Sequence, residues 1–320
     1  MLYRILKIIS RIAIRIYCRK IVINKPEILN TEGPVLIAAN HPNSFLDSVI
    51  LNTLFEKDIW ALARGDVFRK PFFAKLLHSL NILPVYRTSE GSENLNENYK
   101  TFEACTYKLK ENAIIKIYSE GLCVNEWHLR TLKKGTARLA IRAWEEGIPL
   151  KVLPAGINYS SFRKFGKNVF LNFGEFITIQ DMNFNGTDGL RHQQFNCKLQ
   201  EQLSRLVYEI DENDIFMKKK ILTVPQNITK RILLFLPAAI GYVVNMPLYI
   251  PAKHFTYRKT KETVHYDSVI TALLLILYIP YLVLITAFVW FISGWWYSIF
   301  LLLLIPFTAW AYVQLKEQTD

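Results

Sequence analysis

Between residues 29 and 215, short apolar runs alternate with segments of helical periodicity. The expected strands are Val35–Ala39, Ile59–Ala63, Ile82–Tyr86, Ala113–Tyr118, Leu150–Pro154 and Val169–Phe173. The expected helices are Ser44–Phe55, Pro71–Ser79, Leu95–Glu111, Thr136–Glu146 and roughly 193–210. This alternation predicts an α/β fold, with a mixed, mostly parallel sheet flanked by helices, for the domain at residues 29–215.

The first twenty residues have the pattern of an amphipathic helix. At 100° per residue, Arg4, Lys7, Arg11 and Arg15 fall within roughly 80° of one another, and the other positions are mostly apolar. Because the charges interrupt the apolar positions, the segment does not resemble a cleaved secretory signal. We expect residues 1–28 to form an N-terminal amphipathic helix at the membrane interface, lying on anionic lipid. The alternative is a helix packed on the body of the protein.

The C-terminal part contains two long apolar segments. Residues 268–292 and 295–313 are nearly free of charge, and each is about as long as the ~20 residues that span a bilayer. Only Ser293 and Gly294 separate them, and tryptophans flank the turn, as in an aromatic belt. We therefore expect a two-helix transmembrane hairpin over residues 268–313.

A third apolar stretch, residues 231–251, is interrupted by prolines, a glycine and an asparagine. If it spanned the bilayer, the basic residues Lys253 and Arg258 would lie on the outer side, against the positive-inside rule. We interpret residues 216–267 as a basic segment that is re-entrant or interfacial. The expected protein is a multi-pass membrane protein with its folded body on the cytoplasmic face.

The overall composition agrees with a membrane location. Lys and Arg number 39 and Asp and Glu 27, which gives +12, while 51% of the residues are hydrophobic. Nucleic acid is not an expected partner, because the chain has no zinc finger, RNA-recognition signature or recognition-helix pattern. The four cysteines form no CxxC pair and the histidines are scattered, so we expect neither a disulfide framework nor a metal site, and no cofactor.

The first chemically suggestive segment follows the first expected strand. It reads Asn40-His41-Pro42-Asn43-Ser44-Phe45-Leu46-Asp47. A histidine with a nearby carboxylate forms a general base and its orienting partner, and ligands bind at the carboxyl ends of strands in open α/β sheets. The alternative is that Ser44 or Asp47 only caps the following helix.

Three further motifs follow in order. Arg64 and Gly65 open the second, which is followed by Arg87. The third is Ser119-Glu120-Gly121, and the fourth is Leu153-Pro154-Ala155-Gly156-Ile157. Between the third and the fourth, Arg130, Lys133 and Lys134 supply positive charge.

These four ordered motifs, over roughly residues 30–180, resemble the glycerolipid acyltransferase family, which includes lysophosphatidate and glycerol-3-phosphate acyltransferases. The resemblance implies that His41 is the general base, with Asp47 as its partner, although five residues separate them here and four in the family pattern. It implies substrate-binding roles for Asn40, Arg64, Gly65, Arg87, Glu120, Gly121 and Pro154. The third motif lacks the family arginine, so Arg130, Lys133 and Lys134 are candidates to replace its charge.

The activity implied is transfer of a fatty acyl chain from acyl-CoA or acyl-carrier protein to the hydroxyl of lysophosphatidic acid, in phospholipid biosynthesis. Glycerol 3-phosphate and a lyso-aminolipid remain alternative acceptors. The alternative from another class is a non-catalytic membrane lipid-binding protein on the same fold.

Overall fold

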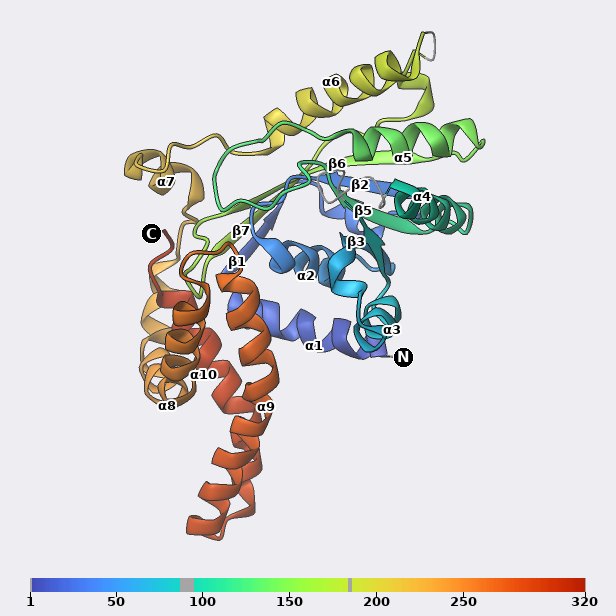
Figure 1. Cartoon of the computed structure of the whole chain (residues 1–320). Helices are drawn as coiled ribbons and strands as arrows, with labels where there is room; N and C mark the ends of the chain where they lie inside the picture. Colours follow the sequence, from blue (N-terminus) through green and yellow to red (C-terminus); the bar gives the residue numbers. More distant parts are fainter. Residues whose placement is uncertain (1, 87–94, 184–185, 320) are drawn as a thin grey trace.

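A single mixed sheet organises the domain in the computed structural model, which describes residues 2–86, 95–183 and 186–319 (Figure 1). Its strands are β1 (Lys20–Ile23), β2 (Val35–Ala39), β3 (Ile59–Arg64), β4 (Ile82–Val85), β5 (Ile114–Tyr118), β6 (Lys151–Tyr159) and β7 (Asn168–Phe173), in the order β1-β7-β6-β2-β5-β3-β4. The pairs of neighbouring strands are parallel except β6 and β7, which are antiparallel. The predicted mixed, mostly parallel sheet is therefore confirmed.

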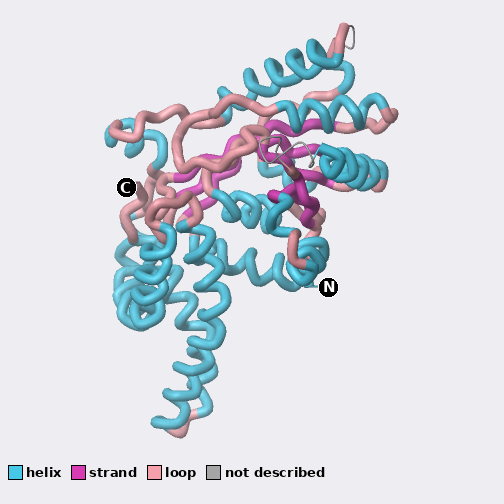
Figure 2. The backbone as a smooth tube through the Cα atoms, in the orientation of Figure 1, coloured by secondary structure: helices cyan, strands magenta, loops and turns pink. Residues whose placement is uncertain are grey.

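Helices cover both faces of this sheet (Figure 2). In chain order they are α1 (Leu2–Tyr17), α2 (Ser44–Leu54), α3 (Pro71–Ser79), α4 (Leu95–Lys110), α5 (Lys134–Glu145), α6 (Asp188–Leu206), α7 (Ile215–Leu222), α8 (Ile228–Thr260), α9 (Tyr266–Ser293) and α10 (Leu301–Leu315). One buried apolar cluster joins the sheet to α1 and α2, and a second joins it to α4, α5 and α6. The central strand β2 is buried along its whole length, as expected for a parallel strand covered on both faces.

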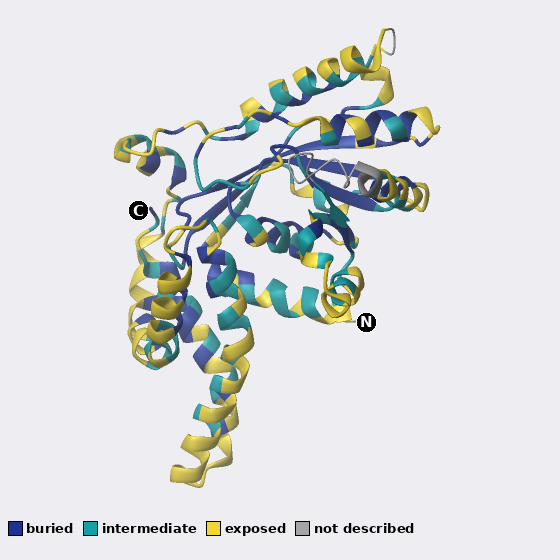
Figure 3. Cartoon of the chain, viewed as in Figure 1, coloured by how far each residue is buried: buried dark blue, intermediate teal, exposed yellow. Residues whose placement is uncertain are grey.

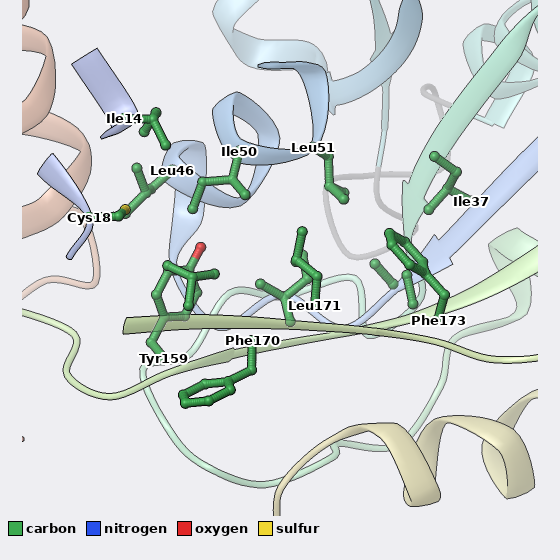
Figure 4. Packing of buried hydrophobic residues seen from close by; sticks show 14 of the residues in the cluster. Ile14, Cys18, Ile37, Leu46, Ile50, Leu51, Tyr159, Phe170, Leu171 and Phe173 are labelled. Carbon is green, nitrogen blue, oxygen red and sulfur yellow. The ribbon is translucent and has the colours of Figure 1, made fainter. Parts of the chain in front are cut away.

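The cluster under α2 includes side chains that bear on the site. Figure 4 shows Leu46 and Ile50 of α2 and Ile14 of α1 on the same side of the sheet as the Tyr159 hydroxyl. Tyr159 is fully buried. Its hydroxyl therefore needs a hydrogen-bond partner inside the protein.

The sequence analysis missed β1 and α7. The helix expected over residues 1–28 ends at Tyr17, and Lys20–Ile23 then pairs with β7 as an edge strand. Only four residues long and partly exposed, this strand carries too little pattern to recognise. Helix α6 begins at Asp188, before the expected start near residue 193.

Two residues of the basic face of α1, Lys7 and Arg11, point toward the protein, while Arg4 and Arg15 are exposed. Lys7 donates hydrogen bonds to the carbonyls of Glu56 and Lys57, and Arg11 donates to the carbonyl of Thr53 at 2.7 Å. These carbonyls lie at or just beyond the C-terminus of α2, where the helix dipole favours cations. The expectation that the basic face of this helix meets anionic lipid is therefore wrong for Lys7 and Arg11. The face of α1 next to this basic stripe exposes Leu2, Ile5, Ile8 and Ile12.

The C-terminal helices α9 and α10 extend from the domain as a hairpin, joined at Gly294 and a short helical turn, Trp296–Phe300 (Figure 1). Gly294 has φ 68°, a left-handed conformation that glycine adopts without strain. The hairpin surface is largely apolar and exposed (Figure 3). Within the described residues, three helical segments are long and apolar enough to cross a membrane: 228–260, 266–293 and 296–315.

Helix α8 runs through residues 228–260, including three prolines, as one helical segment. Near its start, Lys230 donates to the side chain of Gln314, and just beyond its end the carbonyl of Lys261 accepts from Arg163. Both ends therefore contact residues beside the folded domain. The re-entrant or interfacial disposition of this segment stays a prediction.

Residues that follow the hairpin return to the sheet. The Gln318 side chain accepts from the side chain of Asn168 at 2.7 Å and from the backbone N–H of Val224 at 2.6 Å. Asn168 is the first residue of β7 and is fully buried. The buried side chain of Asn168 thus obtains a hydrogen-bond acceptor from a residue that follows the hairpin in the chain.

Candidate active site

The candidate site lies at the carboxyl ends of β2 and β5, which are neighbouring parallel strands. His41 follows β2, and Glu120 follows β5. The backbone N–H of His41 donates to Glu120 Oε2 at 2.8 Å, and Glu120 Oε1 accepts from the backbone N–H of Arg130 at 3.0 Å. Burial raises the pKa of Glu120 above its ordinary value. Glu120 thus joins the loop that carries His41 to the loop that carries Arg130.

His41 and Asp47 are in direct contact. The distance between His41 Nδ1 and Asp47 Oδ2 is 2.8 Å, within the hydrogen-bonding range that the sequence hypothesis requires. Asp47 is fully buried, whereas the His41 side chain is 19% exposed. A carboxylate only accepts, so Nδ1 carries the proton and Nε2 is left as the accepting nitrogen.

Two more donors orient the Asp47 carboxylate. The Tyr159 hydroxyl donates to Oδ1 at 2.6 Å, and the backbone N–H of Asn43 donates to Oδ2 at 2.9 Å. Asn43 precedes the first residue of α2, so Asp47 also satisfies a backbone group at the start of this helix. The contacts of Asp47 are therefore compatible with both interpretations, and its orienting role stays a prediction.

Tyr118 supports the ring of His41, and the sequence analysis assigned it no role. The two rings are stacked, with centroids 3.8 Å apart and planes 7° apart. The Tyr118 hydroxyl is 2.8 Å from Ser48 Oγ on α2. Burial, with a contribution from Asp47, raises the pKa of Tyr118 well above its ordinary value, so its hydroxyl is neutral and the ring remains an uncharged support.

A buried lysine lies close to this group. The Lys116 ammonium donates to the carbonyl of Ser48 at 2.8 Å and to the side chain of Asn52 at 2.5 Å. Burial lowers the pKa of Lys116 to about 7, while Asp47 opposes the shift. The sequence analysis did not use this lysine, although a lysine within the apolar strand Ile-Ile-Lys-Ile-Tyr indicates an unusual buried charge.

Asn40, just after β2, holds the end of β2 against the neighbouring strand β6. Its side-chain Nδ2 donates to the carbonyl of Ile157 at 3.0 Å, and its Oδ1 accepts from the N–H of Ile157 at 2.7 Å. Asn40 is buried, and both amide groups are occupied. Its contacts are those of a structural clamp between the end of β2 and β6.

The predicted cations of the third motif lie near Glu120. Lys133 precedes α5, Lys134 is its first residue, and both are exposed; the N–H of Lys133 donates to the carbonyl of Ser119 at 2.7 Å. Gly121 has φ 66°, and a Cβ there would lie 3.1 Å from the Lys133 side chain. The Arg130 guanidinium pairs with Glu126 at 2.8 Å.

The second motif lies farther along the sheet, and the fourth lies in β6, next to β2. Arg64 ends β3, which is separated from β2 by β5, and its guanidinium pairs with Asp66. Gly65 lies against the ring of Tyr86, and Arg87 falls outside the described residues. Pro154 lies within β6 opposite Ala38, and its carbonyl accepts from Gly174. These are sheet contacts, and the pocket role expected for Pro154 stays a prediction.

A cavity of about 220 Å³ opens among α1, α2, β3 and α9. Its lining is mostly apolar and includes Phe45, Val49 and Leu275, together with Ser48. Ser48 in this lining contacts the hydroxyl of Tyr118, which stacks on His41, although neither Tyr118 nor His41 lines the cavity itself. A second cavity, of about 330 Å³, lies among α1, α8, α9 and α10. Within the described residues, no cluster of side chains could hold a metal ion.

Residues 20–158 match the family model described as Acyltransferase. The match covers β1 to β6 and includes His41, Asp47 and Glu120. Among solved structures, the 1-acyl-sn-glycerophosphate (LPA) acyltransferase PlsC from Thermotoga maritima is similar at 16% identity and a TM-score of 0.41, over 63% of this chain and 78% of that chain. The search of curated proteins gives no match.

Proposed function

We propose that this chain, an O-acyltransferase of the glycerolipid type, transfers a fatty acyl chain from a thioester donor to the free hydroxyl of lysophosphatidic acid. The observation that carries the proposal is the 2.8 Å contact between His41 Nδ1 and the buried Asp47. This contact leaves His41 Nε2 free of the proton and able to accept one from an alcohol. Acyl-CoA and acyl-carrier protein are both candidate donors.

In the proposed reaction, His41 Nε2 takes the proton of the acceptor hydroxyl as its oxygen attacks the thioester carbonyl. A tetrahedral intermediate forms, and the carbon–sulfur bond then breaks. The imidazolium of His41 returns the proton to the departing thiolate, so an ester and a free thiol are the products. Asp47 stabilises the imidazolium while it exists, and the stacked Tyr118 keeps the ring in plane.

The phosphate of the acceptor would bind at the start of α5. Lys133 and Lys134 lie there beside Gly121, and a helix N-terminus also attracts anions. The backbone N–H of Arg130 donates to Glu120, whose carboxylate also accepts from the backbone N–H of His41. A phosphate on these residues would hold the acceptor hydroxyl on the side of His41.

The acyl chain would enter the cavity of about 220 Å³ between α1 and α2. Apolar lining suits a hydrocarbon chain, and Ser48 links the cavity to Tyr118 and so to His41. The exposed isoleucines of α1 and the exposed apolar hairpin would place this entrance at the bilayer surface, with the domain on the cytoplasmic side.

The test is acyl transfer by the purified protein in detergent. Lysophosphatidic acid, glycerol 3-phosphate and a lyso-aminolipid are offered side by side, each with acyl-CoA and with acyl-carrier protein. We expect turnover of lysophosphatidic acid that is lost in His41→Ala and kept in His192→Ala, a matched control on α6.

The outcomes separate the parts of the proposal. Turnover of only glycerol 3-phosphate or only the lyso-aminolipid would show that lysophosphatidic acid is the wrong acceptor, while acyl transfer as the reaction would stand. Turnover that survives His41→Ala would overturn the mechanism. Turnover that is lost in Lys133→Ala/Lys134→Ala at low acceptor concentration and returns at high concentration would support the phosphate site.

A further inference from the structure

A second buried carboxylate lies behind the loop that carries His41. Asp267 is the second residue of α9 and is fully buried. Its carboxylate accepts from Asn43 Nδ2 at 2.6 Å and from the Tyr17 hydroxyl at 2.6 Å, and it pairs with the ammonium of the fully buried Lys167. Segments far apart in sequence thus meet at one side chain.

Two more contacts join the start of α9 to the start of α2, which lie close together (Figure 1). Ser44 Oγ is 2.7 Å from His265 Nδ1, and the N–H of Phe45 donates to Ser268 Oγ at 3.1 Å. Ser44 has φ 50°, a left-handed conformation that costs a non-glycine residue free energy. The surrounding contacts must hold it there.

Asn43 connects this group to the site. Its backbone N–H donates to Asp47 Oδ2, the same oxygen that contacts His41, while its side chain donates to Asp267. Asn43 also lies in the segment that is one residue longer than the family spacing. The longer segment therefore has a physical partner, which is the first turn of the membrane hairpin.

We propose that Asp267, in the first turn of α9, is a positioning residue. It anchors Asn43 and thereby keeps the Asp47 carboxylate against the His41 ring. The membrane hairpin is then part of the catalytic geometry as well as an anchor. This inference rests on the proposed function for its kinetic consequence, and its structural consequence can be measured without turnover.

The competing role is purely structural, because removing one partner of a buried ion pair leaves an unpaired charge and destabilises the fold. The test therefore removes both charges together. Asp267→Leu/Lys167→Met replaces the pair with apolar side chains and deletes the acceptor for Asn43. Asp267→Asn/Lys167→Met also removes both charges but keeps a carbonyl oxygen that can accept from Asn43, with Tyr17 turned to accept from the new amide.

Thiol labelling provides a readout that needs no substrate. The N–H of Ser44 donates to Cys123 Sγ at 2.9 Å, so a displaced loop would expose this half-buried thiol. The labelling rate of Cys123 is followed in a Cys197→Ser background, because Cys197 is the exposed cysteine, and Cys18 and Cys105 are buried. Asp181→Leu/Lys198→Met removes a distant ion pair as the matched control.

We expect the Leu/Met variant to lower kcat at least about tenfold with KM changed less than about twofold, and to speed Cys123 labelling about tenfold, as for a local opening eased by ~1.4 kcal/mol. The Asn/Met variant should restore both readouts to near wild type. If the two variants lose kcat equally, or if the Leu/Met variant changes neither readout, the positioning role is wrong. If the wild type turns over no glycerolipid acceptor, the proposed function fails, while the labelling rates still decide the anchor.

Discussion

Replacement of Asp47 by asparagine tests the role of the negative charge beside His41. Oδ2 of Asp47 faces two N–H groups, from Asn43 and from His41, and the backbone N–H of Asn43 cannot reverse its direction. Among the described residues, Oδ1 accepts from the hydroxyl of Tyr159, which can turn to accept a hydrogen bond instead. The amide introduced by Asp47→Asn therefore places its oxygen toward His41 and its NH₂ toward Tyr159. His41 keeps its tautomer and loses only the negative charge beside it.

The magnitude follows from that loss. A unit charge about 4 Å from the imidazolium contributes about 4 kcal/mol at an effective dielectric constant of about 20. Part of this is recovered because a neutral amide oxygen still accepts the hydrogen bond. A rise of about 3 to 4 kcal/mol in the activation barrier lowers kcat roughly 10²- to 10³-fold. A reversed tautomer would cost more, since the corresponding change in the serine-protease triad lowers kcat about 10⁴-fold.

The assay is steady-state acyl transfer with the acceptor that the wild type uses, together with the ¹⁵N chemical shifts of histidine-labelled protein. Asp188→Asn, at an exposed aspartate on α6, is the control. A kcat within about tenfold of the wild type would show that the charge of Asp47 does not stabilise the reaction. A proton found on Nε2 of His41 in Asp47→Asn would refute the argument about the orientation of the amide.

Three other predictions concern buried groups. Lys116 has a pKa of about 7 in the folded protein against an ordinary 10.5, so the unfolded chain binds its proton more tightly. The stability of the wild type therefore rises with pH between those values. The thermal midpoint of Lys116→Met, relative to that of the wild type, should fall as pH increases from about 7 to about 10. Glu120→Gln loses one acceptor for the N–H groups that Glu120 binds and should lower kcat roughly 10- to 100-fold, as measured by acyl transfer; a normal kcat would mean that the loop of His41 holds its place without this carboxylate. Gly65→Ala would put a Cβ 2.1 Å from the ring of Tyr86, so the thermal midpoint should drop by several degrees, and an unchanged midpoint would contradict that packing.

The sheet was predictable because its central strands are buried on both faces and read as unbroken apolar runs, as in Val35–Ala39. The end of the first of these strands also placed His41 and Asp47 at one edge of the sheet, whereas the contact between His41 and Glu120 was not predicted. β1 was not predictable, because its four residues form a strand only when the edge of β7 is available. The direction of the basic face of α1 was missed for a similar reason. Periodicity reveals that Lys7 and Arg11 share a face and gives no information on which carbonyls that face will meet.

The supporting residues of the site lay beyond sequence reasoning. Tyr159 follows Asp47 by more than a hundred residues, and only the sheet order β7-β6-β2 brings its hydroxyl to that carboxylate. Asp267 is farther still and reads, in sequence, as a charge at the edge of a membrane segment. The extra residue in the His41 motif was visible in the sequence, but the contact of Asn43 with Asp267 was not, since it depends on the position of α9.

The return of residues 314–319 to the sheet has a consequence for biogenesis. The buried Lys167 and Asn168 precede the hairpin in the chain, yet they obtain partners from Asp267 and Gln318, on either side of it. During synthesis, Lys167 therefore lacks its carboxylate partner until Asp267 has been made, and Asn168 lacks one of its two acceptors until Gln318 has been made. Completion of the domain therefore depends on the hairpin being made and placed, and a chain whose hairpin is misplaced would lack these contacts and be open to quality-control proteases.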